Sequence, residues 1–161
     1  MMYQFKIMTQ AQAEEIAFHW HYDSDYSFYD MEADEEDLEE FIDPSKRGDS
    51  KFAVINRGEL IGFFSVNPVD DQTVDIGLGM RPDQTGRGKG LAFLEAGIAF
   101  VQREYEPNTI TLSVATFNQR AINVYKAFGF RDVKTFMQHT NGNNYEFLKM
   151  EYEVKQSNDS N

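Results

Sequence analysis

The chain has 161 residues, no cysteine and a formal net charge of −12 at pH 7. This length is typical of one domain with a full core, and we expect a single domain over 1–154 and a flexible tail over 155–161. The absence of cysteine excludes disulfides, a thiolate nucleophile and cysteine metal sites. The negative charge argues against nucleic acid or an anionic membrane as partner, because phosphate contacts need a basic surface.

The sequence contains no apolar stretch long enough to span a bilayer. Its first ten residues also lack the charged-then-apolar pattern of a signal peptide. We therefore expect a cytoplasmic protein without a membrane partner.

Hydrophobic periodicity and turn residues predict an alternation of strands and helices. In chain order we expect a strand over 3–7, helices over 10–20 and 31–42, strands over 52–55, 60–66 and 73–81, a helix over 90–104, a strand over 109–115, a helix over 119–128, and strands over 130–138 and 145–154. Strands that alternate with helices in the centre of the chain imply an α/β (α+β) fold, in which helices flank a mixed sheet.

A glycine-rich loop, Gly86-Arg87-Gly88-Lys89-Gly90, joins the strand over 73–81 to the helix that follows. Alternating glycines let backbone N–H groups surround one point, and the unpaired N–H groups at the start of the helix point there too. Arg87 and Lys89 lie where a helix dipole repels cations, and a bound polyphosphate would remove that conflict. The loop is therefore predicted to bind an anion.

Two common nucleotide-binding patterns fail at this loop. Asp83 stands where a P-loop needs its first glycine, and Gly90 stands where it needs Ser or Thr to hold the metal ion. A dinucleotide fingerprint that begins at Gly86 would need a small residue at Leu91. The anion is therefore expected to belong to another kind of ligand.

A second motif follows the strand over 109–115. Asn118 is a good helix N-cap and Gly129 a good residue to end the helix, and Tyr125 lies on the same helix face as Asn118, roughly two turns away. The loop resembles the acetyl-CoA loop of the GNAT acyltransferase superfamily, with Thr85 in place of the usual Gln or Arg. The second motif, Asn118 to Tyr125 and then Gly129-Phe130, resembles that superfamily as well.

The resemblance implies a mostly antiparallel sheet and transfer of an acetyl group from acetyl-CoA to an amine, without a metal ion. It implies that acetyl-CoA is held by Gly79, Met80, Thr85, Gly86, Arg87, Gly88, Lys89, Gly90, Asn118 and Tyr125. It further implies that a backbone N–H near Met80 stabilises the oxyanion, where the strand over 73–81 separates from the strand over 109–115.

Two residues are candidates for proton transfer. Tyr125 is expected to protonate the departing thiolate, and the alternative is that it only packs beside Ile122 and Phe128. Asp75, on the strand that leads into the loop, is a candidate base whose pKa burial would raise. The alternatives for Asp75 are a solvated carboxylate at a sheet edge and a chain of water molecules that takes the proton instead.

Aromatic residues and carboxylates alternate over 18–30, and such a segment can hold a cation by cation–π attraction and charge. We expect Trp20, Asp25, Tyr26 and Tyr29 to contact a cationic acceptor amine, and the alternative is that the aromatic rings are buried for packing. The acidic run over 32–40 is expected to form a solvated helix face.

The sequence therefore predicts an N-acetyltransferase with acetyl-CoA as co-substrate. Its acceptor is a cationic small molecule or an amine of a peptide or protein, and the residues do not separate these. The alternative from another class is a non-catalytic CoA-binding or interaction domain of the same fold. Exposed strands near the C-terminal end are compatible with a homodimer.

Overall fold

Seven strands form one sheet in the order β1-β2-β3-β4-β5-β7-β6 in the computed structural model, which describes residues 3–155. The strands are β1 (Tyr3–Ile7), β2 (Lys51–Asn56), β3 (Glu59–Pro68), β4 (Thr73–Met80), β5 (Thr109–Ala115), β6 (Arg131–Thr140) and β7 (Asn143–Glu153). Only β4 and β5 pair in parallel, and all other neighbours are antiparallel. This confirms the mixed, mostly antiparallel sheet. Apart from Lys155, the tail predicted over 155–161 lies outside the described residues.

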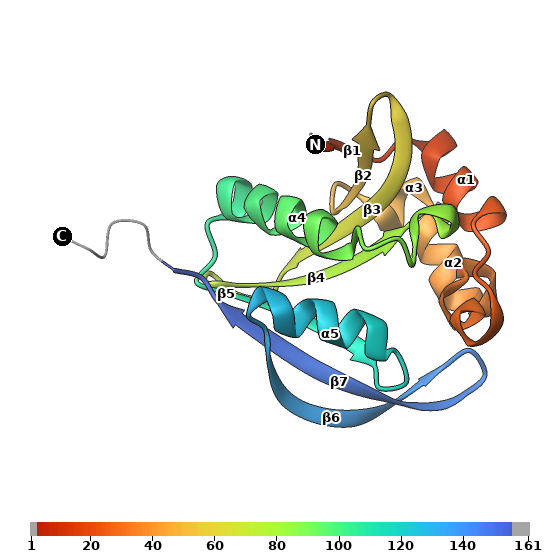
Figure 1. Ribbon diagram of the computed structural model, residues 1–161. Helices are drawn as coiled ribbons and strands as arrows, with labels where there is room; N and C mark the ends of the chain where they lie inside the picture. Colours follow the sequence, from red (N-terminus) through yellow and green to blue (C-terminus); the bar gives the residue numbers. More distant parts are fainter. Residues whose placement is uncertain (1–2, 156–161) are drawn as a thin grey trace.

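Helices cover both faces of this sheet (Figure 1). They are α1 (Gln10–His19), α2 (Glu35–Ile42), α3 (Pro44–Arg47), α4 (Gly90–Tyr105) and α5 (Gln119–Phe128), with the 3-10 helices η1 (Ser24–Tyr29), η2 (Met31–Ala33) and η3 (Pro82–Gln84). Helices α4 and α5 pack on the main core, whereas α1 and α2 enclose a smaller one. Within residues 3–155, no helix is long and apolar enough to cross a membrane.

The acidic helix predicted over 31–42 begins later than expected. Asp34 is the N-cap of α2, and its Oδ2 atom accepts a hydrogen bond from the Asp37 N–H at 3.0 Å. A capping carboxylate satisfies a free N–H group at the start of a helix and favours an extended backbone at its own position. The prediction was therefore wrong for 31–34, where η2 and the cap precede α2.

Helix α4 packs closely on the sheet because it presents a glycine to a phenylalanine. Gly97 is buried, and a methyl group added at its Cα would overlap the ring of Phe64, which is itself fully buried between Phe5 and Phe93. Because core side chains are close-packed, the ring could move aside only by displacing these neighbours. This close approach places the start of α4 near the end of β4.

Gly97→Ala is therefore expected to destabilise the protein by about 1–3 kcal/mol, although alanine favours helices. Urea unfolding followed by circular dichroism measures the change in the free energy of unfolding. Ala99→Gly, on the exposed face of the same helix, is the control and should cost about 0.5–1 kcal/mol. Equal stability of Gly97→Ala and the unmodified protein would show that Phe64 can move aside.

Strands β4 and β5 pair over only part of their length. Their register runs from Thr73 opposite Thr109 to Asp75 opposite Thr111, and beyond these residues the two strands separate. On its other side, β4 remains paired with β3 up to Met80, and the Arg81 N–H donates to the Ile61 carbonyl at 2.8 Å. Because hydrogen-bonding directions alternate along a strand, the N–H group of Met80 points away from β3 and into this gap.

Candidate functional site

A cavity of about 560 Å³ lies where β4 and β5 separate, a volume usual for a small-molecule site. Gly79 and Met80 form its middle. One end, which we call the loop half, is lined by Thr85, Gly86, Gly88, Gly90, Asn118 and Tyr125. The rest of the lining, which we call the α2 half, includes Tyr26, Tyr29, Asp37, Glu40, Lys51 and Ser65, and it meets the loop half where Tyr29 contacts Asn118. The cavity therefore joins the glycine loop to the acidic helix.

The backbone of the loop half suits an anion. Gly86 and Gly88 have φ values of +70° and +72°. Residues other than glycine rarely adopt such backbone angles. No atom lies within 4 Å of the position that a Cβ on Gly88 would take, so the space beside this residue is open. No side chain caps α4, and its first turn carries no acidic residue. Its first N–H groups therefore remain available to a phosphate group.

Three polar residues of the loop are arranged differently from the glycines. Arg87 is exposed and Lys89 donates from Nζ to the Gln84 side chain at 2.9 Å, and neither lines the cavity. Thr85 lines the cavity, but its hydroxyl donates to the Pro82 carbonyl at 2.7 Å. The loop half is therefore formed chiefly by backbone atoms.

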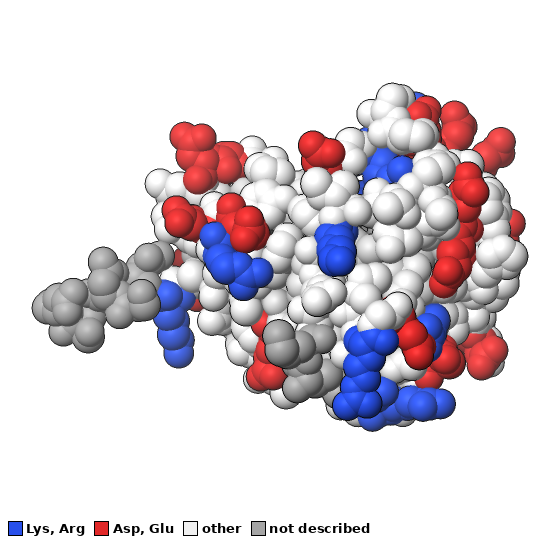
Figure 2. Space-filling view, turned by 90° about the horizontal axis from the view of Figure 1, so that it is seen from above, with Lys and Arg blue, Asp and Glu red and all other residues white. Residues whose placement is uncertain are grey.

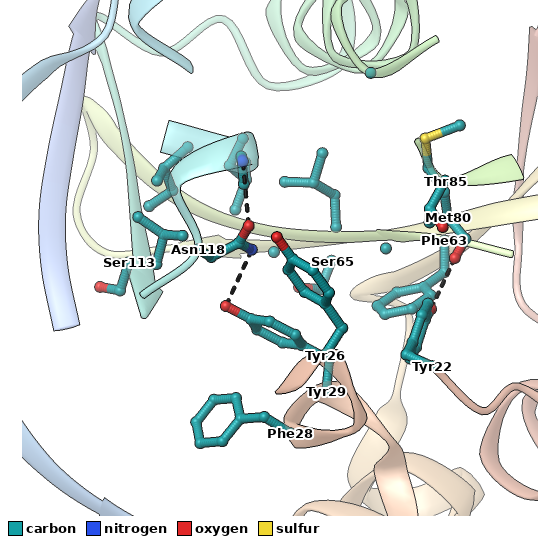
Figure 3. Close-up of a pocket in the computed structure, with 18 of the residues that line it drawn as sticks. Tyr22, Tyr26, Phe28, Tyr29, Phe63, Ser65, Met80, Thr85, Ser113 and Asn118 are labelled. Carbon is teal, nitrogen blue, oxygen red and sulfur yellow. Dashed lines mark hydrogen bonds between the residues drawn. The ribbon is translucent and has the colours of Figure 1, made fainter. Parts of the chain in front are cut away.

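The end of β4 is held by a tyrosine from the segment between α1 and η1. The Tyr22 hydroxyl donates to the Met80 carbonyl at 2.7 Å (Figure 3), and burial raises the pKa of this phenol. This contact leaves the Met80 N–H group directed into the gap. Sequence reasoning missed Tyr22, because only its place within the aromatic segment over 18–30 distinguishes it.

Asn118 connects α5 to the aromatic segment. Its side-chain oxygen accepts from the Ala121 N–H at 3.2 Å and caps α5, as its place at the start of the helix predicts. Its amide nitrogen donates to the Tyr29 hydroxyl at 3.2 Å (Figure 3). Both polar atoms of Asn118 are thus engaged within the protein, and they fix the position of Tyr29 at the cavity.

Tyr125 lines the loop half, and its ring packs against Phe130 with 6.0 Å between the ring centroids. No residue in the described range forms a hydrogen bond with its hydroxyl. Burial, and to a lesser degree the nearby Tyr29, raise the pKa of the Tyr125 phenol. The phenol therefore keeps its proton at neutral pH and has it to donate.

Asp75 lies apart from these residues. It is on the paired part of β4 and β5, it does not line the cavity, and its carboxylate accepts from the Thr111 hydroxyl at 2.7 Å. Burial raises the pKa of Asp75, whereas the Thr111 hydrogen bond and the charge of Lys149 oppose that shift. The structure does not bring Asp75 together with Tyr125, because the strands have not yet separated at Asp75.

The predicted acceptor residues fall into two groups. Tyr26 and Tyr29 line the cavity, and the Arg120 guanidinium lies 4.3 Å from the centre of the Tyr26 ring. Trp20 is only 4% exposed and packs against Phe63, so it belongs to the core between α1 and β3. Asp25 is exposed and does not line the cavity. The structure therefore brings the two tyrosines to the site, and not Trp20 or Asp25.

The acidic helix contributes more than the solvated face that the sequence predicts. Asp37 and Glu40, both on α2, line the cavity together with Lys51 at the start of β2. Figure 2 shows acidic side chains along the side of the molecule where α1 and α2 lie, at the right of the view. No group of three or more His, Cys, Asp or Glu side chains suited to a metal ion occurs within residues 3–155.

Hydrogen bonds from the β6–β7 turn close the α2 half. The N–H group of Asn141 donates to Asp34 Oδ1 at 2.9 Å, and its side-chain amide donates to the Phe28 carbonyl at 2.9 Å. The sequence predicts a turn at this place but not its partners, which lie far away in the chain. The turn thereby ties the last two strands to the segment that forms the aromatic wall.

Several solved structures share this fold. An acetyltransferase (GNAT family) from Bacillus anthracis has a TM-score of 0.74 at 20% identity, over 94% of each chain. Spermidine N-acetyltransferase from Vibrio cholerae, solved with CoA and spermine, has a TM-score of 0.73 at 16% identity, over 94% of this chain and 95% of that one. PseH from Campylobacter jejuni, solved with acetyl coenzyme A, has a TM-score of 0.67 at 19% identity, over 96% and 100%.

Sequence comparison points the same way. Mycothiol acetyltransferase from Propionibacterium freudenreichii subsp. shermanii is 37% identical over 82 residues, and the match spans 48% of this chain but only 26% of that protein. The family model of the acetyltransferase (GNAT) domain matches residues 5–131, which include the loop, Asn118 and Tyr125. The chain belongs to the GNAT acetyltransferase family.

Proposed function

We propose that the protein is an N-acetyltransferase that moves an acetyl group from acetyl-CoA to a primary amine. One observation carries this proposal: a single cavity joins the glycine-rich loop to an acidic, aromatic chamber at the gap between β4 and β5. The cradle of Gly86, Gly88 and the uncapped start of α4 fits a pyrophosphate. Bound there, acetyl-CoA would supply the acetyl group as a thioester directed toward the gap.

Two groups of this chain would act on the reacting atoms. The Met80 N–H, which points into the gap, would donate a hydrogen bond to the acetyl oxygen as negative charge develops on it. The Tyr125 phenol, which is protonated at neutral pH, would give that proton to the sulfur as the C–S bond breaks. The Tyr22 hydrogen bond to the Met80 carbonyl would hold the oxyanion donor in place.

The acceptor amine must lose a proton before it can attack. Asp75 lies outside the cavity, whereas Asp30, Asp37 and Glu40 line it. We infer that water in the α2 half takes the proton and passes it toward these carboxylates, so that no single residue is the base.

The α2 half is also suited to a cationic acceptor. Its walls combine the rings of Tyr26 and Tyr29 with the carboxylates of Asp37 and Glu40. The net charge of −12 would attract cations and repel anions over longer distances. We infer that the preferred acceptor carries a net positive charge.

The proposed function is tested by thiol release from acetyl-CoA with a panel of amines, followed with a thiol-reactive dye. We expect turnover with cationic primary amines and little with neutral ones. The KM for the acceptor should rise between low and physiological salt, because ions screen the attraction between charges. A protein that binds acetyl-CoA but releases no thiol with any amine would be a non-catalytic CoA-binding domain.

A further inference from the structure

A single lysine stands among the carboxylates of the α2 half. Lys51 lines the cavity and is half-buried, and no carboxylate of residues 3–155 comes within 4.0 Å of its ammonium group. No described residue forms a hydrogen bond with that ammonium either. A half-buried ammonium without a close partner is costly, because it has lost water contacts and gained little in exchange. Lys51 is therefore available to an anionic group that enters the cavity.

The surroundings of Lys51 carry both signs of charge. Burial lowers the pKa of Lys51, and the carboxylates of Glu40 and Asp37 oppose that shift. Burial raises the pKa of Asp37, and the charges of Asp34, Glu40 and Glu36 raise it further. Lys51, Asp37 and Glu40 thus line the α2 half as separate charges rather than as closed ion pairs.

The sheet places Lys51 at a definite distance from the reacting centre. Lys51 is opposite Ser65 on β3, and Ser65 is opposite Gly77 on β4, three residues before Met80. With strands about 4.8 Å apart and about 3.3 Å per residue, the Cα atoms of Lys51 and Met80 are roughly 14 Å apart. That separation accommodates a small molecule with the reacting amine at one end and an anionic group at the other.

We propose that Lys51 determines acceptor specificity by binding a carboxylate of the acceptor, so that the substrate is a diamino acid or a similar dipolar amine rather than a simple polyamine. In this arrangement Asp37 and Glu40 bind the ammonium group next to that carboxylate, and the distal amine reaches the gap between β4 and β5. Such an acceptor still carries a net positive charge. The inference rests on the proposed function and narrows it to one class of substrate.

A simple polyamine fits this chamber less well. Its ammonium groups would find Asp37 and Glu40, but Lys51 would repel them without compensation. If Lys51 only balanced the charge of the two carboxylates, removing the carboxylate from the acceptor would not weaken binding. The two interpretations therefore differ in what they predict for amines that are matched except for one carboxylate.

The experiment compares such pairs: lysine with 1,5-diaminopentane, and ornithine with 1,4-diaminobutane. Thiol release gives kcat and KM for each amine with the unmodified protein and with Lys51→Met, Lys51→Arg and Lys46→Met. Lys51→Arg keeps the positive charge. Lys46 is exposed, pairs with Glu39 at 3.5 Å and does not line the cavity, so it serves as the matched control.

We expect the unmodified protein to prefer the amino acid of each pair by about 10- to 100-fold in kcat/KM. Lys51→Met should lose that preference, mainly through a higher KM for the amino acid, whereas Lys51→Arg and Lys46→Met should keep it. Diamines that are acetylated as well as the amino acids would overturn the inference and leave acetyl transfer intact. Preference for the amino acids that survives in Lys51→Met would also overturn it. Absence of thiol release with all four amines would overturn the inference, whereas the proposed function would be contradicted only if no amine of the wider panel gave turnover.

Discussion

Gly88→Val is expected to abolish acetyl-CoA binding. Valine is strained at the φ of +72° that Gly88 adopts. Relief of that strain would turn the neighbouring N–H groups away from the proposed pyrophosphate site. The new side chain would also occupy space that is open in the structure and that a pyrophosphate would enter. Isothermal titration calorimetry with acetyl-CoA measures the loss directly.

Gly58→Val is the matched control for this experiment. Gly58 has a φ of +80°, no atom within 4 Å of the position of an added Cβ, and a place in the β2–β3 turn outside the cavity. This variant should carry a similar local strain and still bind acetyl-CoA. Unchanged affinity in Gly88→Val would place the cofactor elsewhere in the protein.

Tyr125→Phe is expected to lower kcat by roughly 10²–10⁴ while acetyl-CoA affinity changes little. The ring and its packing against Phe130 are kept, and only the proton of the phenol is lost. Steady-state kinetics with an accepted amine, together with calorimetry, separates the two effects. Tyr152→Phe is the control, because Tyr152 also packs against Phe130 but does not line the cavity.

The pH dependence adds a second test of Tyr125. A phenol with a raised pKa is protonated at every pH below that pKa, so Tyr125 should not cause a fall in rate between pH 6 and about 10. Over that range kcat/KM should rise with pH as the acceptor amine loses its proton. A Tyr125→Phe variant within twofold of the unmodified protein would show that Tyr125 only packs.

Features that depend on neighbours in the chain were predicted correctly. The glycine-rich loop joins β4 to α4 as expected, and the cap that Asn118 forms on α5 follows from its residue type and position. Strand β5 and helix α5 have the predicted bounds because their periodicity is regular. Such features arise from backbone sterics and hydrogen bonds that span only a few residues.

Contacts between segments that are distant in the chain determine which of the predicted residues line the cavity. Trp20, Tyr26 and Tyr29 are similar candidates in the sequence, but the packing of α1 on β3 buries Trp20 while the Asn118 hydrogen bond holds Tyr29 at the cavity. The register of β4 and β5 places the candidate base Asp75 before the gap and outside the cavity lining. Local pattern cannot distinguish these outcomes, because each residue type suits either environment.

Residues 118–125 and the loop could therefore be located from sequence alone, whereas the chamber that would receive the acceptor could not. Lys51 and Asp37 belong to elements whose patterns indicate an ordinary strand and a solvated helix face. They come together because β2 pairs with β3 and α2 packs across the same face of the sheet. Sequence periodicity determines which face of an element is apolar, but only the pairing of distant strands and the packing of helices on them determine which polar groups share a cavity.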